Sequence, residues 1–305
     1  MAALCLAAVC LAPASRADAG ERGKAPYHRI VSLSPNLTEI LFAVGLGDRV
    51  VGVTRFCEYP PEAARLPRVG GYFDTNIEAV VALEPDLVVM LPVHESARSV
   101  LGRLDIECLT VGNETIQEIL SSITAIGDRC GAADSATAVR ARIERRIETI
   151  RRLTADRRRP SVLVVVSREY GSSLAGLCAA ARGTFYDELV DAAGGRNVMD
   201  SPVPAYPELS LEGLLHLDPD VIIEIVPAAE ARRLDMESLM AGWRNSPGLR
   251  AVRDGRVTLL TGRYAAIPGP RLPLLLEEMT AAIHPDLAGQ AGLIRTGTNP
   301  TRPAR

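Results

Sequence analysis

Two glutamates, Glu78 and Glu212, stand at equivalent positions of a sequence that occurs twice. Residues 76–91 read NIEAVVALEPDLVVML, and residues 210–225 read SLEGLLHLDPDVIIEI. Each copy predicts a short helix with a polar cap, an acidic-Pro-Asp turn and a buried strand. The helix dipole favours a carboxylate in the first turn, so we expect both glutamates to stay exposed. Two lobes built alike suggest a two-lobed binding protein that a partner contacts at two points.

Aromatic residues make up only 4% of the chain, and several lie in loops near the ends of predicted strands. Ligands of open parallel sheets bind beyond the carboxyl ends of the strands, where aromatic side chains can hold a flat, partly apolar ligand. We therefore predict that Phe56, Tyr72 and Tyr206 line a cleft. Tyr59 and Phe73 are further candidates. The alternative is that these rings only fix loops to the core.

Polar candidates follow strands in the same way. Asn36 comes shortly after one predicted strand, and Arg263 follows the last one. His94 follows a buried strand, and a neutral imidazole there could coordinate iron or cobalt. The competing interpretation is a histidine that is hydrogen bonded within the fold. Trp243 is predicted to be structural.

Several function classes are excluded or disfavoured. The formal charge of −3 and the pI near 5.9 give no basic face for nucleic acid. The chain has no nucleophile-elbow, H-E-x-x-H or P-loop pattern, and no G-x-G-x-x-G follows a strand. These absences argue against a secreted α/β enzyme, which remains the alternative from another class.

The N-terminus predicts export. An apolar stretch at 2–12 is too short to span a membrane, and Ala17-Asp18-Ala19 offers a small-x-small cleavage site. Residues 1–19 are therefore expected to be a signal peptide. A lipid anchor at Cys10 is less favoured, because the bulky Val9 precedes it. Four cysteines remain in the mature chain and match no zinc pattern; they form either one or two disulfides or buried small hydrophobes. They are Cys57, Cys108, Cys130 and Cys178.

The elements that must position these residues predict an α/β fold. Strands and helices alternate in two stretches, 28–131 and 160–287, which indicates two lobes with mainly parallel sheets. Residues 132–159 contain no Pro or Gly and carry apolar residues at helical spacing, so they predict one long connecting helix. The arginines at 157–159 are expected to form its solvated end. Residues 288–305 are expected to be a disordered tail.

Six segments together resemble one family, and the similarity covers about residues 28–287. They are RIVSLSPNLTE (29–39), VGV (51–53), YPP (59–61), the 76–91 unit, AGGRN (193–197) and GPR (269–271). The chain is similar to the iron-siderophore, haem and vitamin B12 periplasmic binding proteins of ABC importers, and within that family to the vitamin B12-binding members. Leu91 departs from the vitamin B12-binding members, in which a tryptophan stands there.

The resemblance implies a helical-backbone, class III periplasmic binding protein. It implies a monomer that clamps a corrinoid between its lobes, with Phe56, Tyr72 and Tyr206 as cleft residues. It also implies that Glu78 and Glu212 dock on arginines of an ABC permease and ATPase complex. Haem or a ferric siderophore is the alternative ligand: Tyr72 or His94 could ligate haem iron, and several arginines could face an anionic chelate. Those arginines are Arg55, Arg68, Arg168 and Arg263.

Overall fold

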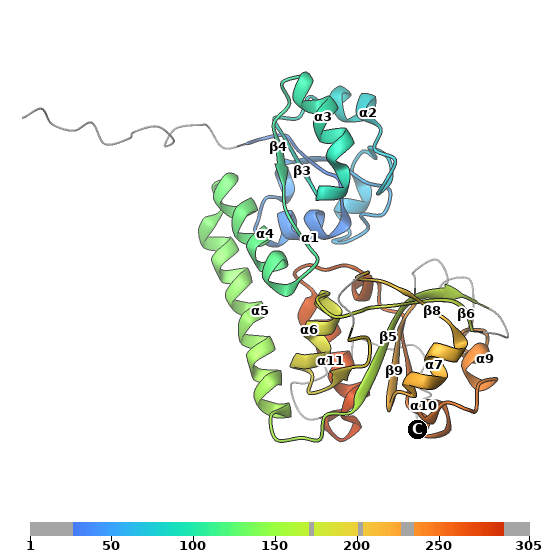
Figure 1. Cartoon of the computed structure of the whole chain (residues 1–305). Helices are drawn as coiled ribbons and strands as arrows, with labels where there is room; N and C mark the ends of the chain where they lie inside the picture. Colours follow the sequence, from blue (N-terminus) through green and yellow to red (C-terminus); the bar gives the residue numbers. More distant parts are fainter. Residues whose placement is uncertain (1–26, 171–173, 201–203, 227–234, 290–305) are drawn as a thin grey trace, which may run out of the picture.

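The computed structural model describes residues 27–170, 174–200, 204–226 and 235–289. It contains two α/β lobes that are joined along one side by the long helix α5 (Figure 1). The predicted signal peptide and residues 290–305 of the predicted tail lie outside the described residues. None of the described helices is long and apolar enough to cross a membrane.

The first lobe is built on a four-stranded sheet in the order β2-β1-β3-β4, and every pairing in it is parallel. Pro35 occupies the first helical position of α1, directly after Ser34, as the sequence predicts. The strands are β1 (Ile30–Ser32), β2 (Val50–Val53), β3 (Leu87–Met90) and β4 (Cys108–Thr110). The helices are α1 (Pro35–Ala43), α2 (Ile77–Ala82), α3 (Glu95–Arg103) and α4 (Ile116–Arg129), with 3-10 turns at Gly47–Arg49, Ala63–Arg65 and Pro92–His94.

The second lobe has a mixed sheet, in the order β10-β9-β5-β6-β8, with β7 paired to β5. The strand β6 is antiparallel to both of its neighbours, whereas the other pairings are parallel. The strand β6 was not predicted from the sequence, because its small residues give a weak strand signal. The strands are β5 (Ser161–Glu169), β6 (Ala175–Ala179), β7 (Arg196–Asn197), β8 (Glu208–Leu209), β9 (Val221–Ile225) and β10 (Val257–Leu260).

Helices cover both faces of this second sheet (Figure 1). Trp243 belongs to a separate apolar cluster that packs on one face of this sheet. Its indole is fully buried, so Trp243 is structural, as predicted. The helices are α6 (Phe185–Ala192), α7 (Leu211–Leu217), α9 (Met236–Arg244), α10 (Arg250–Arg253) and α11 (Leu272–Ile283), with 3-10 turns at Arg263–Ala266 and Pro285–Leu287.

The connector α5 runs over Ala133–Thr154. Its 22 residues span about 33 Å at 1.5 Å per residue. The sequence predicts that this helix ends at residue 159, but it already ends at Thr154. Pro160 disfavours a helical conformation in the residue that precedes it. The arginines at 157–159 are partly or largely exposed, in line with the expected solvated end, and they also pair with acids of the second lobe. The pairs are Arg157–Asp286, Arg158–Asp220 and Arg159–Asp191.

The sequence repeat corresponds to one structural unit in each lobe. Asn76 caps α2 and Ser210 caps α7 through their side-chain oxygens. The acidic residue of each turn is left-handed, with φ of 45° at Glu84 and 34° at Asp218. The chain then enters the buried strands β3 and β9. Each copy therefore forms the helix-turn-strand unit that the sequence predicts.

The aspartates of the two turns tether the neighbouring strand. The Asp86 carboxylate accepts hydrogen bonds from the backbone N–H groups of His28 and Arg29, at 2.7 and 3.0 Å, just before β1. The Asp220 carboxylate accepts one from the Ser161 N–H, at 2.9 Å, at the start of β5. The repeat therefore fixes the central strand of each sheet.

One apolar core continues through both lobes. It includes Leu37 of α1, Ile119 of α4, Ile143 of α5, Leu189 of α6 and Leu276 of α11, all buried. A backbone hydrogen bond of 2.7 Å from Phe185 N to Glu114 O also crosses between the lobes. The lobes are thus packed together on the α5 side of the molecule.

Candidate functional site

A cavity of about 280 Å³ lies between the lobes at the carboxyl ends of β1 and β2. A second hollow of about 100 Å³ adjoins it and shares Pro35, Phe56 and Ile267. We call the two together the interlobe cleft. The first is lined by Ser34, Pro35, Asn36, Phe56, Tyr72 and Asn113 of the first lobe and by Ala266, Ile267 and Pro268 of the second.

Asn36 enters the cleft from the first turn of α1. Its side chain is buried, and Ser34 Oγ donates a hydrogen bond of 2.5 Å to its Oδ1. The β1-to-α1 turn thus fixes the amide and aims it at the cavity. The predicted cleft position of Asn36 agrees with this placement.

The aromatic wall consists of Phe56 and Tyr72. Phe56 is 53% exposed and lines both hollows. Tyr72 is half-buried, and its ring meets the Phe73 ring edge to face at 4.8 Å. Burial raises the pKa of the Tyr72 hydroxyl, which also forms a hydrogen bond with the Asn113 side chain. The cleft therefore offers aromatic faces beside two amide side chains.

His94 is not placed to ligate a metal, which corrects that candidate. Its Nδ1 accepts a hydrogen bond from Leu91 N at 3.1 Å, and its Nε2–H donates to Tyr72 O at 2.8 Å. Burial lowers the pKa of the imidazole. Both ring nitrogens are thus used by the backbone, and His94 fixes the Tyr72 loop to the end of β3.

The arginines at the cleft form ion pairs. Arg263 of the second lobe pairs with Glu58 of the first, and Arg55 pairs with Asp74 and lowers the pKa of that carboxyl. Arg271 Nε bonds Glu39 Oε2 at 2.8 Å, in a pair that also crosses between the lobes and has little solvent exposure. The positive charges near the ligand space are therefore already balanced.

The two other candidate arginines are structural. Arg168 is buried in the second lobe, where its Nε lies 3.0 Å from Glu224 Oε1. Arg68 donates to the carbonyl oxygens of Thr54 and Cys57, at 2.8 and 2.9 Å. Neither residue lines the interlobe cleft.

Tyr206 lies just outside the lining of the two hollows. Its ring is half-buried against the shared core. Burial raises the pKa of its hydroxyl, and the nearby groups of Glu114, Cys178 and Tyr72 raise it further. The two tyrosines therefore stand close to the same exposed carboxylate, that of Glu114.

The described cysteines are all free thiols, so the disulfide alternative is not realised in this structure. Cys57 and Cys130 are buried, and burial raises the pKa of each thiol, to about 11 for Cys130. The Cys57 Sγ contacts Thr38 Oγ1 and Thr54 Oγ1, each at 3.1 Å. These thiols behave as the small buried groups of the alternative interpretation.

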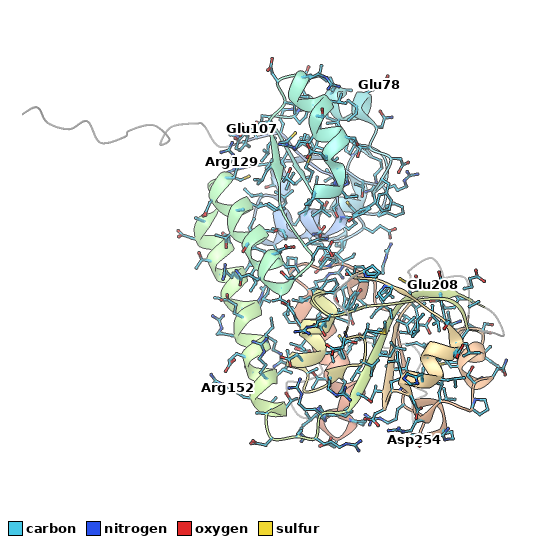
Figure 2. The ribbon with its side chains drawn as sticks, viewed as in Figure 1. Glu78, Glu107, Arg129, Arg152, Glu208 and Asp254 are labelled. Atoms are coloured by element: carbon cyan, nitrogen blue, oxygen red, sulfur yellow. The ribbon has the colours of Figure 1, made fainter. Side chains whose placement is uncertain are left out.

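Glu78 and Glu212 are exposed on α2 and α7. Neither carboxylate has a hydrogen-bond or ion-pair partner among the described residues. In Figure 2, Glu78 lies on the opposite side of the molecule from Arg152 of α5. In Figure 1, α7 also lies on the side of its lobe away from α5.

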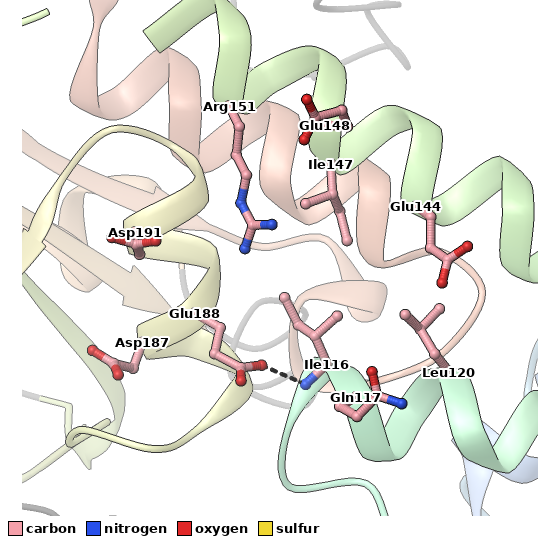
Figure 3. Close-up of a pocket in the computed structure, with 10 residues that line it drawn as sticks. All are labelled: Ile116, Gln117, Leu120, Glu144, Ile147, Glu148, Arg151, Asp187, Glu188 and Asp191. Atoms are coloured by element: carbon pink, nitrogen blue, oxygen red, sulfur yellow. Dashed lines mark hydrogen bonds between the residues drawn. The ribbon is translucent and has the colours of Figure 1, made fainter. Parts of the chain in front are cut away.

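A larger hollow of about 600 Å³ lies beside α5, between the starts of α4 and α6 (Figure 3). Glu188 Oε2 accepts a 2.5 Å hydrogen bond from Ile116 N there. Burial raises the pKa of Glu188. The hollow has no aromatic wall and lies away from the carboxyl ends of the strands, so the interlobe cleft is the better ligand site. Its carboxylates are Glu144, Glu148, Asp187, Glu188 and Asp191.

Two α/β lobes, one connecting helix and a cleft between the lobes define a two-lobed solute-binding protein. The chain matches the family model described as periplasmic binding protein over residues 30–264. It therefore belongs to the periplasmic binding protein family.

Three relatives illustrate the similarity. A vitamin B12-binding protein of Vibrio parahaemolyticus is 27% identical over 248 residues, which cover 81% of this chain and 86% of the relative. The periplasmic vitamin B12-binding protein BtuF of Vibrio cholerae superposes with a TM-score of 0.72 at 25% identity, covering 87% of this chain and 99% of that one. A periplasmic haem-binding protein of Pseudomonas aeruginosa gives a TM-score of 0.73 at 27% identity, covering 85% and 93%.

Sequence reasoning missed cleft residues in both lobes. Asn113 lies in the loop between β4 and α4 of the first lobe, and Ala266, Ile267 and Pro268 follow β10 of the second. The position of these loops after parallel strands could have indicated them. Their residue types, however, carry no distinctive signal.

Proposed function

We propose that this protein captures a corrinoid, a vitamin B12-like ligand, in the interlobe cleft and delivers it to an ABC importer. The observation that carries the proposal is the balanced charge of the cleft. Arg263 and Arg271 line the cleft and each already faces a carboxylate, as does Arg55 beside the Phe56 ring. A ligand with two carboxylates, such as haem, or an anionic ferric chelate would have to displace those partners.

The remaining polar groups of the cleft suit an uncharged, amide-rich ligand. The corrin ring carries amide side chains, and the amides of Asn36 and Asn113 can both donate to and accept from such groups. Phe56 and Tyr72 provide faces for the macrocycle. The exposed carboxylate of Glu114 near Tyr72 would repel a polyanion.

Haem remains the second candidate because of the similar haem-binding structure. A haem site needs an axial ligand, but His94 is held by the backbone at both nitrogens. Tyr206 lies outside the lining of the cleft, and the ring of Tyr72 packs against Phe73. These features favour the corrinoid, and we propose that the protein catalyses no reaction.

The proposed route is export, binding and docking. Residues 1–19 direct the chain across the inner membrane, and the protein acts in the periplasm as a monomer. Glu78 and Glu212 then pair with arginines of a permease that works with an ATPase. Their exposure and their lack of a partner in the described chain support this role.

The ligand is tested by visible absorbance. Purified mature protein is titrated separately with cyanocobalamin, haemin and a ferric hydroxamate chelate. We expect a saturable spectral change with cyanocobalamin at one ligand per chain and much weaker binding of the other two. Saturable binding of haemin without binding of cyanocobalamin would overturn the corrinoid proposal.

Docking is tested separately with the double variant E78A/E212A. We expect unchanged ligand affinity and folding but loss of transport into vesicles that carry the permease, since truncating one side of a desolvated charge pair costs about 2–5 kcal/mol. Arginine substitutions should be worse than alanine because they add repulsion. Normal transport, or loss of ligand binding, would show that these glutamates do not dock.

A further inference from the structure

Each of the two exposed glutamates has an exposed apolar neighbour. Val81 follows Glu78 by three residues and is 37% exposed. Leu215 follows Glu212 by three residues and is 46% exposed. Residues three apart on a helix lie on the same face, so each carboxylate has an apolar side chain one turn further along its helix.

The two apolar residues occupy equivalent positions of the repeat, one in each lobe. The residue before each of them supports the core: Val80 and Leu214 are fully buried in separate apolar clusters. Packing therefore needs Val80 and Leu214 but leaves Val81 and Leu215 in solvent. A single exposed apolar residue requires no explanation. Here, however, both lobes expose an apolar residue beside a carboxylate that has no partner among the described residues. This repetition is harder to attribute to chance.

Both helices lie on the side of the molecule away from α5 (Figure 1). Because the two helices face the same side and one belongs to each lobe, a single large partner on that side can contact both. By contrast, Leu153 of α5 is exposed but has no carboxylate three residues before it.

We propose that Val81 and Leu215 are contact residues for the permease, which presents an arginine beside an apolar socket at each of two similar sites. This inference rests on the proposed function. It adds apolar contacts to the charge pairs of the docking surface. An apolar contact next to a charge pair excludes water and strengthens the pair.

The two contacts are not identical. Leu211, before Glu212, is 46% exposed, whereas its counterpart Ile77 is only half-exposed. The second lobe therefore presents two apolar side chains around its glutamate and the first lobe mainly one. We expect the second-lobe contact to contribute more to docking.

The test uses V81S, L215S and the double variant, with L153S as the matched control because Leu153 is 39% exposed on α5. Affinity for the cognate permease–ATPase complex in lipid nanodiscs is measured with cyanocobalamin-loaded protein. We expect about tenfold weaker docking for L215S, a smaller loss for V81S and a larger loss for the double variant. L153S should dock like wild type, and cyanocobalamin affinity should be unchanged in all four.

Salt separates the apolar contacts from the charge pairs. Raising the ionic strength to about 0.5 M should shrink the defect of E78A/E212A in the rate of association, because salt screens the attraction between the charged groups before they pair. The higher ionic strength should not change the docking defect of V81S/L215S. The conservative double variant V81I/L215M should dock like wild type. If E78A/E212A lose docking but V81S/L215S bind like wild type, the apolar inference fails while the proposed function stands. If wild-type protein does not bind the complex, both fail.

Discussion

At the scale of single residues, the central feature is the pairing of each cleft arginine with a carboxylate. Glu58 pairs with Arg263 across the lobes, and both line the same hollow. The identity of the ligand therefore depends on acids as much as on the aromatic residues that the sequence analysis emphasised.

We predict that Glu58→Gln increases haemin affinity, by about tenfold, because it leaves Arg263 free for a ligand carboxylate. Cyanocobalamin affinity should change little. The variant Glu95→Gln, which breaks the surface pair with Arg98, is the control. Absorbance titration measures both ligands, and an unchanged haemin affinity in Glu58→Gln would show that charge balance does not set selectivity.

The aromatic wall should supply much of the binding energy. Tyr72→Ala is expected to weaken cyanocobalamin binding by roughly 2 kcal/mol, as truncation of an aromatic anchor does. Tyr206→Ala is expected to weaken it less, because that ring lies outside the lining of the cleft. Tyr72→Phe should lose less, because the ring remains and only the contact of the hydroxyl with Asn113 is removed. Leu104→Ala is the control, since that side chain is 51% exposed and lies outside the cleft lining. If both alanine variants bind like wild type, the cleft is not the ligand site.

Sequence reasoning reached the cleft unevenly. Four predicted residues do line it: Asn36, Phe56, Tyr72 and Arg263. They could be predicted because they follow strands or belong to scarce residue types. His94 was misleading, since whether an imidazole is free or bound by the backbone depends on the path of a loop 22 residues away. The partners of the arginines could not be predicted, because ion pairs between lobes join residues far apart in sequence.

At the scale of elements, the repeated turns carry the strongest sequence signal. Their aspartates, Asp86 and Asp220, each hold the start of a neighbouring strand. The motif thus predicted the helix, the turn and the strand correctly. It could not predict the antiparallel β6, which has no repeat and few β-branched residues.

We predict that Asp220→Asn destabilises the fold at pH 7 by about 1–3 kcal/mol, because it weakens hydrogen bonds to Ser161 and Arg250. Burial would raise the pKa of Asp220, yet these hydrogen bonds hold it below the ordinary value of 3.8. Its contribution is therefore present above pH 3.8 and is lost as the pH falls through the lower folded-state pKa.

Urea unfolding at several pH values measures this effect. The stability difference between wild type and Asp220→Asn should be largest near neutral pH and should shrink in acid. Asp254→Asn, at an exposed position, should have little effect at any pH. A pH-independent difference would show that the charge of Asp220 is not what stabilises the turn.

At the scale of the whole molecule, α5 and the shared core restrict how the lobes can move. The helix has no Gly or Pro, and apolar residues of α1, α4, α6 and α11 pack with it in one cluster. The pair of Glu39 and Arg271 adds a largely buried polar contact between the lobes. Large hinge closure would break all of these contacts.

We therefore predict that cyanocobalamin changes the solution shape only slightly. The radius of gyration from small-angle X-ray scattering should differ by less than about 1 Å between free and bound protein. A decrease of several ångströms would mean that the lobes close on the ligand and that α5 does not hold them.

The most direct measurement is a crystal structure of the protein grown with cyanocobalamin. The account predicts electron density for the corrin ring between the lobes, in contact with Phe56 and Tyr72, with its amide groups near Asn36 and Asn113. The pairs of Arg263 with Glu58 and of Arg271 with Glu39 should remain intact. An empty interlobe cleft, or a corrinoid bound instead in the acidic hollow beside α5, would contradict the account.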